Sequence, residues 1–170
     1  MTERPLRRLL LILLGCAVVG VLAGVVWEAV WTAPTGLVYQ GEWQLDGEGV
    51  QVDVSGTGLY VIIGFCAGLL IGVASALTAR NREVATLVTV AVGSVLAAAL
   101  MAVTGQALGP PDPHPLAAGK KNFTEIDAEL KVEGISPYVA LPAGALTGLA
   151  LCFVGLAGSS RSRSAAEPDG

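Results

Sequence analysis

The segment GLYVIIGFCAGLLIGVASALTA, residues 58–79, is almost entirely apolar and contains no charged side chain. With a rise of about 1.5 Å per residue, a helix over this segment would be about 30 Å long, the thickness of the hydrocarbon core of a bilayer. The length of an apolar block is what separates a membrane span from an ordinary core helix. This segment therefore predicts a membrane-spanning helix.

Three further apolar blocks of similar length lie at residues 9–31, 84–103 and 138–156. The whole chain of 170 residues is 53% hydrophobic and only 14% charged, whereas soluble domains average about 25% charged residues. The mean hydropathy is +0.66. We predict an all-α membrane protein with a four-helix transmembrane bundle. Its predicted parts are a cytoplasmic N-terminus (1–8), a four-span membrane domain (9–157) with outer loops at 32–57 and 104–137, and a disordered cytoplasmic tail (158–170).

Basic residues near the ends of the spans predict the orientation in the membrane, because cytoplasmic flanks hold an excess of Lys and Arg. Seven arginines fall on one side of the predicted topology: Arg4, Arg7, Arg8, Arg80, Arg82, Arg161 and Arg163. The loops on the other side contain more acids than lysines. We therefore expect a multi-pass protein of the plasma membrane with both termini in the cytoplasm.

The first outer loop alternates polar and apolar residues over 37–55, with Asp46-Gly47-Glu48-Gly49 as turn chemistry in the middle. This pattern predicts a β-hairpin. A lone hairpin is marginal in water, and residues 125–133 of the second loop alternate in the same way. We predict a small extracytoplasmic antiparallel β cap, made of hairpin 37–55 and strand 125–133, with its apolar face toward the top of the bundle. Two unrelated floppy loops are the alternative.

Small residues recur at every fourth position in three of the spans. In lipid, helices associate through close backbone contact at such residues. The candidate helix-packing residues are Gly20, Gly24, Gly64, Gly68, Gly72, Gly144 and Gly148. A self-association face or a path for a ligand is the alternative role for them.

The residue types that carry chemistry do not gather into a known motif. His114 stands in GPPDPHP near Asp112, but two ligands do not make a metal site, and the prolines favour a rigid extended spacer. Cys16, Cys66 and Cys152 each fall in a different span and are expected to be small buried hydrophobes. Leu13-Leu14-Gly15-Cys16 also resembles a lipoprotein signal, although the apolar run continues past the cysteine. We predict no cofactor, no metal, no catalytic residues and no nucleic-acid partner.

The order of several short features resembles a known group of proteins. These features are Trp27 and Trp31 at the end of the first span, the hairpin, LYVIIGFCAGLLIG, LGPPDP, and YVALPAGALTG at the start of the fourth span. The chain is similar in these respects to uncharacterised actinobacterial four-transmembrane proteins catalogued as a domain of unknown function. The resemblance implies a bacterial plasma membrane and carries over no catalytic residue.

Three classes of function follow from these observations. The leading hypothesis is a non-enzymatic cell-envelope scaffold that binds another envelope membrane protein through the cap, with Tyr39 and Trp43 as candidate contact residues. The alternative is a small transporter, or a subunit of a transporter or channel, that acts as an oligomer. Its mid-span polar groups would be hydroxyls, and Glu28 is expected at the interface. An enzyme ranks third, because the carboxylates of the loops are expected on solvated faces.

Overall fold

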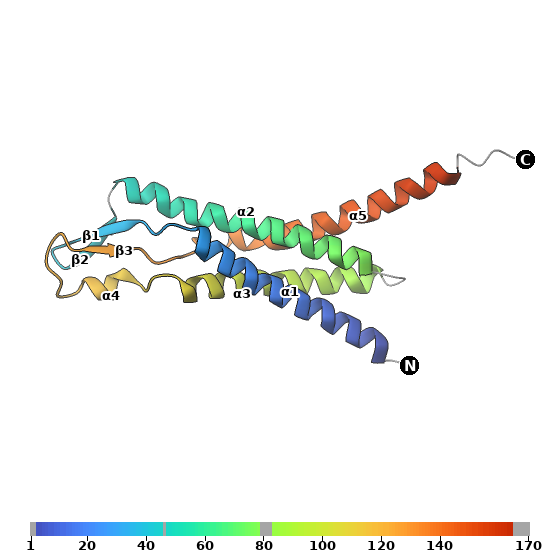
Figure 1. Cartoon of the computed structure of the whole chain (residues 1–170), viewed down its shortest axis with the longest axis horizontal. Coiled ribbons are helices and arrows are strands. Elements are labelled where there is room, and N and C mark those ends of the chain that lie inside the picture. Colours follow the sequence, from blue (N-terminus) through green and yellow to red (C-terminus); the bar gives the residue numbers. More distant parts are fainter. Residues whose placement is uncertain (1–2, 46, 79–82, 165–170) are drawn as a thin grey trace, which may run out of the picture.

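The computed structural model describes the backbone of residues 3–45, 47–78 and 83–164, and the side chains of residues 7, 9–45, 56–77 and 84–154. Four long helices lie along one axis, with a small sheet at one end (Figure 1). The helices are α1 (Glu3–Val30), α2 (Gly47–Thr78), α3 (Glu83–Leu108) and α5 (Ala140–Ser164). Each contains a stretch long and apolar enough to cross a membrane. The predicted membrane bundle is confirmed.

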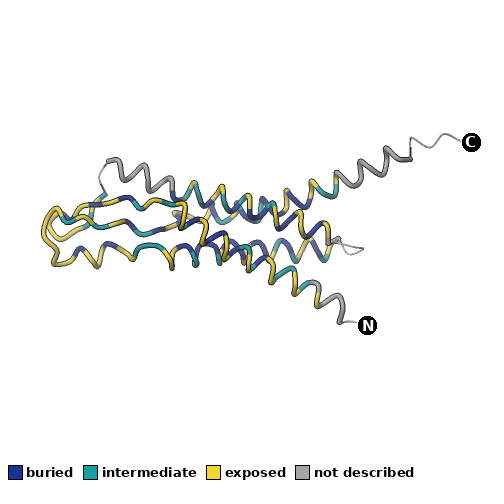
Figure 2. Tube along the Cα trace, viewed as in Figure 1, coloured by how far each residue is buried: buried dark blue, intermediate teal, exposed yellow. Residues whose placement is uncertain are grey.

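The bundle is built from two helix pairs, because α1 packs chiefly against α3 and α2 against α5. Trp27 of α1 joins the pairs at the end nearest the sheet. Its ring meets Tyr60 of α2 edge-on at 5.1 Å, and its indole N–H donates a hydrogen bond to the carbonyl of Gly56 over 2.9 Å. The Tyr60 hydroxyl in turn donates to the carbonyl of Ala98 on α3 over 2.8 Å. Buried residues concentrate along these contacts, while the outer helix surfaces are exposed (Figure 2).

The predicted antiparallel sheet of three strands is present, in the order β2-β1-β3. Its strands are β1 (Thr35–Tyr39), β2 (Glu42–Leu45) and β3 (Glu125–Asp127). Tyr39 pairs with Glu42 and Leu37 with Glu125. The cap therefore joins two loops that are far apart in sequence.

The predicted limits of the hairpin are wrong. The turn lies at Gln40-Gly41, where both residues have positive φ, 53° and 83°. Such two-residue turns match the twist of paired strands. The expected second strand, including Val50, Val52 and Val54, forms the first turns of α2 instead. Adding residues to an existing helix costs far less than starting a new element, so α2 extends to Gly47.

Residues 128–133 keep the predicted alternation but do not form a strand. β3 ends at Asp127, and the next segment is extended, with Ala128, Leu130 and Val132 buried and Lys131 exposed. Leu130 and Val132 join the hydrophobic core of the bundle. The segment thus closes the top of the bundle, a role that the alternating pattern had predicted for the sheet itself.

The proline-rich stretch forms a short helix, α4 (Pro113–Ala117), and the extended spacer predicted there is wrong. Asp112 caps this helix and Pro113 occupies its first turn, where a missing N–H costs nothing. α4 contacts β2 and β3, so it covers the inner face of the sheet in place of the bundle top. A 3₁₀ turn, η1 (Ser136–Val139), leads into α5.

The start of α1 and the end of α5 lie at the end of the bundle opposite the sheet, as do the end of α2 and the start of α3 (Figure 1). This arrangement agrees with the predicted connectivity, while the placement of that end in the cytoplasm stays a prediction. α5 continues to Ser164, into the stretch 158–170 that we expected to be disordered. Ala and Arg are good helix formers and extend a helix that has already begun. Residues 165–170 lie outside the described part of the chain.

Candidate functional site

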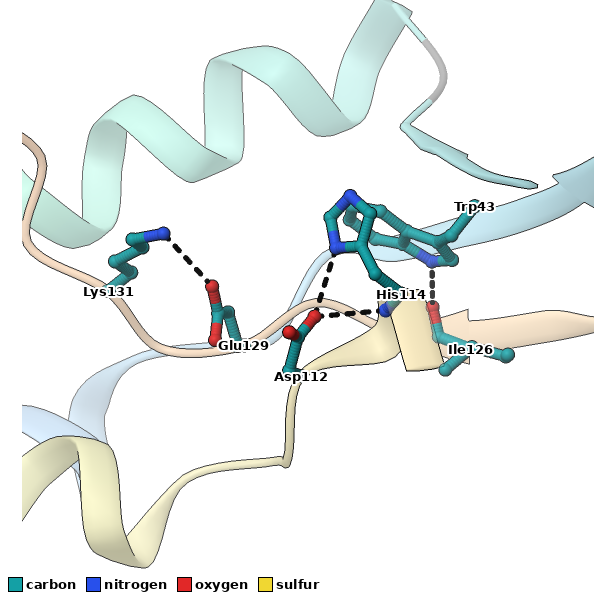
Figure 3. A network of polar contacts seen from close by, with 6 residues as sticks. All are labelled: Trp43, Asp112, His114, Ile126, Glu129 and Lys131. Carbon is teal, nitrogen blue, oxygen red and sulfur yellow. Dashed lines mark hydrogen bonds and ion pairs between the residues drawn. The ribbon is translucent and has the colours of Figure 1, made fainter. Parts of the chain in front are cut away.

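Trp43, one of the two predicted contact residues, is engaged inside the cap. Its indole lies over Gly36 of β1, so closely that a Cβ at Gly36 would clash with it. The indole N–H donates to the carbonyl of Ile126 on β3 over 3.0 Å, and the ring of His114 lies edge-on at 5.5 Å (Figure 3). Trp43 therefore ties β1, β3 and α4 together and is only partly exposed.

His114 and Asp112 form the polar edge of this cluster. The backbone N–H and the Nδ1 atom of His114 both lie 2.9 Å from Oδ1 of Asp112. The backbone hydrogen bond, and then the side-chain one, hold the pKa of the Asp112 carboxyl below its usual value. Both side chains are more than half exposed. The pair stabilises the start of α4. It lies on the exposed surface of the cap and is not a dyad set in a cleft.

The remaining cap carboxylates whose side chains the structure describes are spread out over its surface. Glu129 forms an ion pair with Lys131 at 3.3 Å (Figure 3). Glu42 and Asp127 lie on β2 and β3, with β1 between them. Among the described residues, no three His, Cys, Asp or Glu side chains are placed to hold a metal ion. The side chain of Asp53 lies outside the described residues.

Tyr39, the other predicted contact residue, lies on the open face of the sheet and is 48% exposed. Its ring meets Phe123 edge-on at 6.3 Å between centroids. Phe123 is 72% exposed, and its φ of 66° is unusual for an aromatic residue. Leu37, also exposed, is two positions along the same face of β1. We call Leu37, Tyr39 and Phe123 the aromatic face.

Hydrogen bonds hold Phe123 in this conformation. Its backbone N–H donates to the carbonyl of Val38 over 2.8 Å, and the N–H of Val38 donates to the carbonyl of Thr124 over 3.0 Å. Asn122 accepts from the backbone N–H of Gln40 over 2.9 Å. Strained backbone persists only where the surroundings impose it and is common at binding sites. The ring of Phe123 is therefore presented to solvent from a fixed position.

Phe123 was not predicted as a contact residue. In the sequence it is only the middle residue of Asn122-Phe123-Thr124, a match to the glycosylation sequon, which is a pattern of low specificity. The pairing of this loop with β1 creates its exposure. A lone Phe beside Lys120 and Lys121 in a polar loop was the available signal.

The predicted helix-packing glycines lie mostly at helix contacts. On the α2–α5 side, a Cβ at Gly68 or Gly72 would meet the backbone of Leu141 or Ala145, and a Cβ at Gly144 or Gly148 would meet that of Phe65 or Leu69. On the α1–α3 side, a Cβ added at Gly20 would lie 2.5 Å from the carbonyl oxygen of Ala97. A Cβ added at Gly24 would lie 2.5 Å from the carbonyl oxygen of Met101. Gly64 has more room, with its nearest neighbours at 3.7 Å.

Three mid-span hydroxyls, those of Thr89, Ser94 and Thr147, bond to their own helices. Thr89 donates to the carbonyl of Ala85 over 2.8 Å, and Thr147 donates to that of Ala143 over the same distance. Ser94 donates to the carbonyl of Ala91 over 2.9 Å. These three hydroxyls are therefore engaged with their own helix backbones.

No known family model, curated protein or solved structure matches this chain. The resemblance to actinobacterial four-transmembrane proteins therefore stays a prediction. What the fold defines is an integral membrane protein of four helices with a small sheet beyond one end of the bundle.

Proposed function

We propose that this protein is a non-enzymatic scaffold of the cell envelope, in which the aromatic face binds another envelope membrane protein. The observation that carries the proposal is the contact of Tyr39 with Phe123 on the open side of the sheet. Aromatic residues are enriched in the cores of protein interfaces and among their energetic hot spots. Large rings left in water in a fixed position favour a binding role.

The position of the aromatic face supports a partner outside the bilayer. β1 leads away from the membrane-spanning part of the bundle, and the sheet lies at the end of the molecule opposite the start of α1 and the end of α5 (Figure 1). The apolar stretch of α2 that can cross a membrane begins at Gly56, well after the Gln40-Gly41 turn. In a bilayer around these stretches, the aromatic face would lie beyond the lipid and be open to a protein partner.

The role of Trp43 in this proposal differs from the role first expected. Its indole is already used by Gly36 and Ile126, so Trp43 supports the sheet that presents the aromatic face. Tyr39 stays a candidate contact residue, and Phe123 joins it. The non-enzymatic part of the proposal rests on the described carboxylates of the cap, which are spread out, whereas acid–base catalysis needs groups within hydrogen-bond reach of a substrate.

Photo-crosslinking in intact cells tests the proposal. A benzophenone amino acid replaces Phe123, and in a matched control it replaces Leu116, an exposed residue of α4 away from the aromatic face. We expect one protein to be crosslinked from position 123 and not from position 116. The double variant Tyr39→Ser/Phe123→Ser should lower co-purification of that protein at least about tenfold, as truncation of central aromatic contacts commonly does.

Equal, diffuse crosslinking from both positions would contradict the proposal, as would co-purification that the double variant leaves unchanged. Gel filtration of the double variant in detergent shows whether the bundle is still folded. Both substitutions lie on exposed side chains of the cap, so the elution position should not change.

A further inference from the structure

A groove lies between α1 and α2, in the half of the bundle away from the sheet. Its volume is about 360 Å³. The lining residues are Leu11, Ile12, Gly15, Cys16, Val19, Leu70, Ile71, Ala74 and Ser75. It follows α1 from Leu11 to Val19, a length of about 12 Å at the rise of an α-helix.

The groove exists because the two helix pairs separate in this half. α1 packs against α3 and α2 against α5, and α1 diverges from α2 toward its N-terminal end (Figure 1). Gly15 contributes no side chain, and a Cβ built there would meet nothing within 4 Å. Open space at Gly15 lets the groove reach the floor at Cys16.

The groove opens toward the surroundings of the bundle. Leu11 and Leu70 stand at its rim and are 56% and 69% exposed, whereas Cys16 and Ile71 are buried at its floor. All of these residues lie within stretches that can cross a membrane. In a bilayer the space would therefore face acyl chains, and its almost entirely apolar lining suits them.

An arginine stands in line with one end of the groove. Residues four apart on a helix share a face, and Arg7, Leu11, Gly15 and Val19 form such a row on α1. Arg7 is exposed. It is one turn beyond Leu11, toward the membrane surface, so its guanidinium is available to a headgroup whose chain lies in the groove. Arginine binds phosphate oxygens through paired N–H donors.

We infer that this groove is a binding site for an anionic phospholipid of the leaflet at the N-terminal end of α1. One acyl chain lies between α1 and α2 against Gly15, and the phosphate contacts Arg7. The apolar lining favours an acyl chain, and Arg7, which lies on the same face of α1 as the groove, favours a negatively charged headgroup. This inference does not depend on the proposed scaffold role.

Native mass spectrometry of the full chain, released from detergent, tests the site with added phosphatidylglycerol and phosphatidylcholine. A basic residue near an anionic lipid surface contributes about fivefold in binding, so we expect phosphatidylglycerol to be retained about fivefold more. Arg7→Gln should remove this preference and Arg7→Lys should keep most of it. Arg161→Gln, at the same end of the bundle but on α5, is the matched control and should change nothing.

A second pair of variants tests the acyl chain. Gly15→Phe fills the groove, and Gly58→Phe places the same ring at another helical glycine with open space around its Cβ. We expect Gly15→Phe alone to lower retention of both lipids several-fold. Crosslinks from phosphatidylglycerol with a diazirine in its acyl chain should map to residues 11–19 and 70–75 and disappear in Gly15→Phe.

Three results would overturn the inference. One is equal retention of the two lipids by the unaltered chain. Another is the same retention by Gly15→Phe and Gly58→Phe with both variants folded by circular dichroism. The third is a dimer that Gly15→Phe dissociates, since a second copy of the chain would then occupy the groove.

Discussion

The bundle and the cap close their interiors by opposite means. In the contact of α2 with α5, glycines bring the backbones close together: Gly68 and Gly72 meet the backbone of α5, and Gly144 and Gly148 meet the backbone of α2. In the cap, the large ring of Trp43 fills the space between the sheet and α4. The helix contact is closed by residues without side chains, and the cap is closed by a large side chain.

The difference follows from the two solvents. In a bilayer, burying apolar surface gives helices little reason to associate, because lipid tails are as apolar as leucine, so close backbone contact is what stabilises the pair. In water, burying a large ring is favourable in itself, by about 25 cal/mol for each Å² covered. The α2–α5 contact should therefore be sensitive to added atoms, and the cap to lost ones.

The largest effect is expected for Gly72→Ala. A Cβ at Gly72 would meet the backbone of Ala145 and Leu149, which cannot move aside without separating the helices. We expect a loss of about 3 kcal/mol in the free energy of unfolding, at the upper end of typical overpacking costs. The measurement is reversible unfolding in mixed micelles with increasing denaturing detergent.

Gly64→Ala is the matched control on the same helix. Its Cβ would be in ordinary contact at 3.7 Å from Leu141 and Met101, and alanine favours a helix by about 1 kcal/mol over glycine. We expect no loss of stability in this variant. Equal destabilisation by the two substitutions would show that backbone contact is not what distinguishes Gly72.

An intermediate effect is expected in the cap. Trp43→Ala removes the ring from Gly36 and His114 and should cost about 2 kcal/mol, less than for a fully buried tryptophan because the ring is partly exposed. Trp43→Phe keeps a ring but loses the hydrogen bond to Ile126, for about 1 kcal/mol. Hydrogen exchange of the amides in β1 and β3 measures both losses.

The same measurement separates the two regions. Exchange in the spans of the Trp43 variants should match that of the unaltered chain, because Trp43 contacts the sheet and α4. A parallel increase of exchange in α2 and α5 would mean that cap and bundle unfold as one unit.

The smallest effect is expected for Asp112, whose half-exposed carboxyl caps α4. Its pKa is lowered in the folded chain, so the stabilisation is complete at neutral pH. It declines below the ordinary carboxyl pKa of about 3.9 and is gone once the pH falls below the lowered pKa. Limited proteolysis of residues 109–124 should increase over that range.

Asp112→Asn is the control, because asparagine also caps helices but does not titrate. Proteolysis of this variant should be nearly independent of pH over the same range. Asp112→Ala should show increased proteolysis at every pH. If all three chains respond to acid alike, the capping carboxyl is not the group responsible.

The parts of the fold predicted well are those with one dominant local signal. The four spans follow from block length alone, and the burial of Leu130 and Val132 follows from alternation. The predicted limits of the hairpin were wrong because residues 50–55, although they alternate, extend the neighbouring helix α2. The prediction of an extended spacer at the proline stretch was wrong because Asp112 and Pro113 are also residues that start a helix.

Of the candidate site residues, Tyr39 is exposed as a contact residue must be, whereas Trp43 is used within the cap. The sequence could not predict that Phe123 lies beside Tyr39. The two residues are far apart in sequence, and only the pairing of Val38 with the 123–124 segment brings their rings together. The groove at Gly15 was equally out of reach, since it depends on how far α1 diverges from α2.

The sequence by itself determined that the chain crosses a membrane with four helices and carries β structure outside the bundle. Those properties depend on the apolar length and the period of single segments, which local residue types specify. Only the tertiary structure decided which helices pair, which aromatic ring is buried and which is presented, and where a groove stays open. Each of these depends on contacts between segments distant in the chain, and no single segment contains that information.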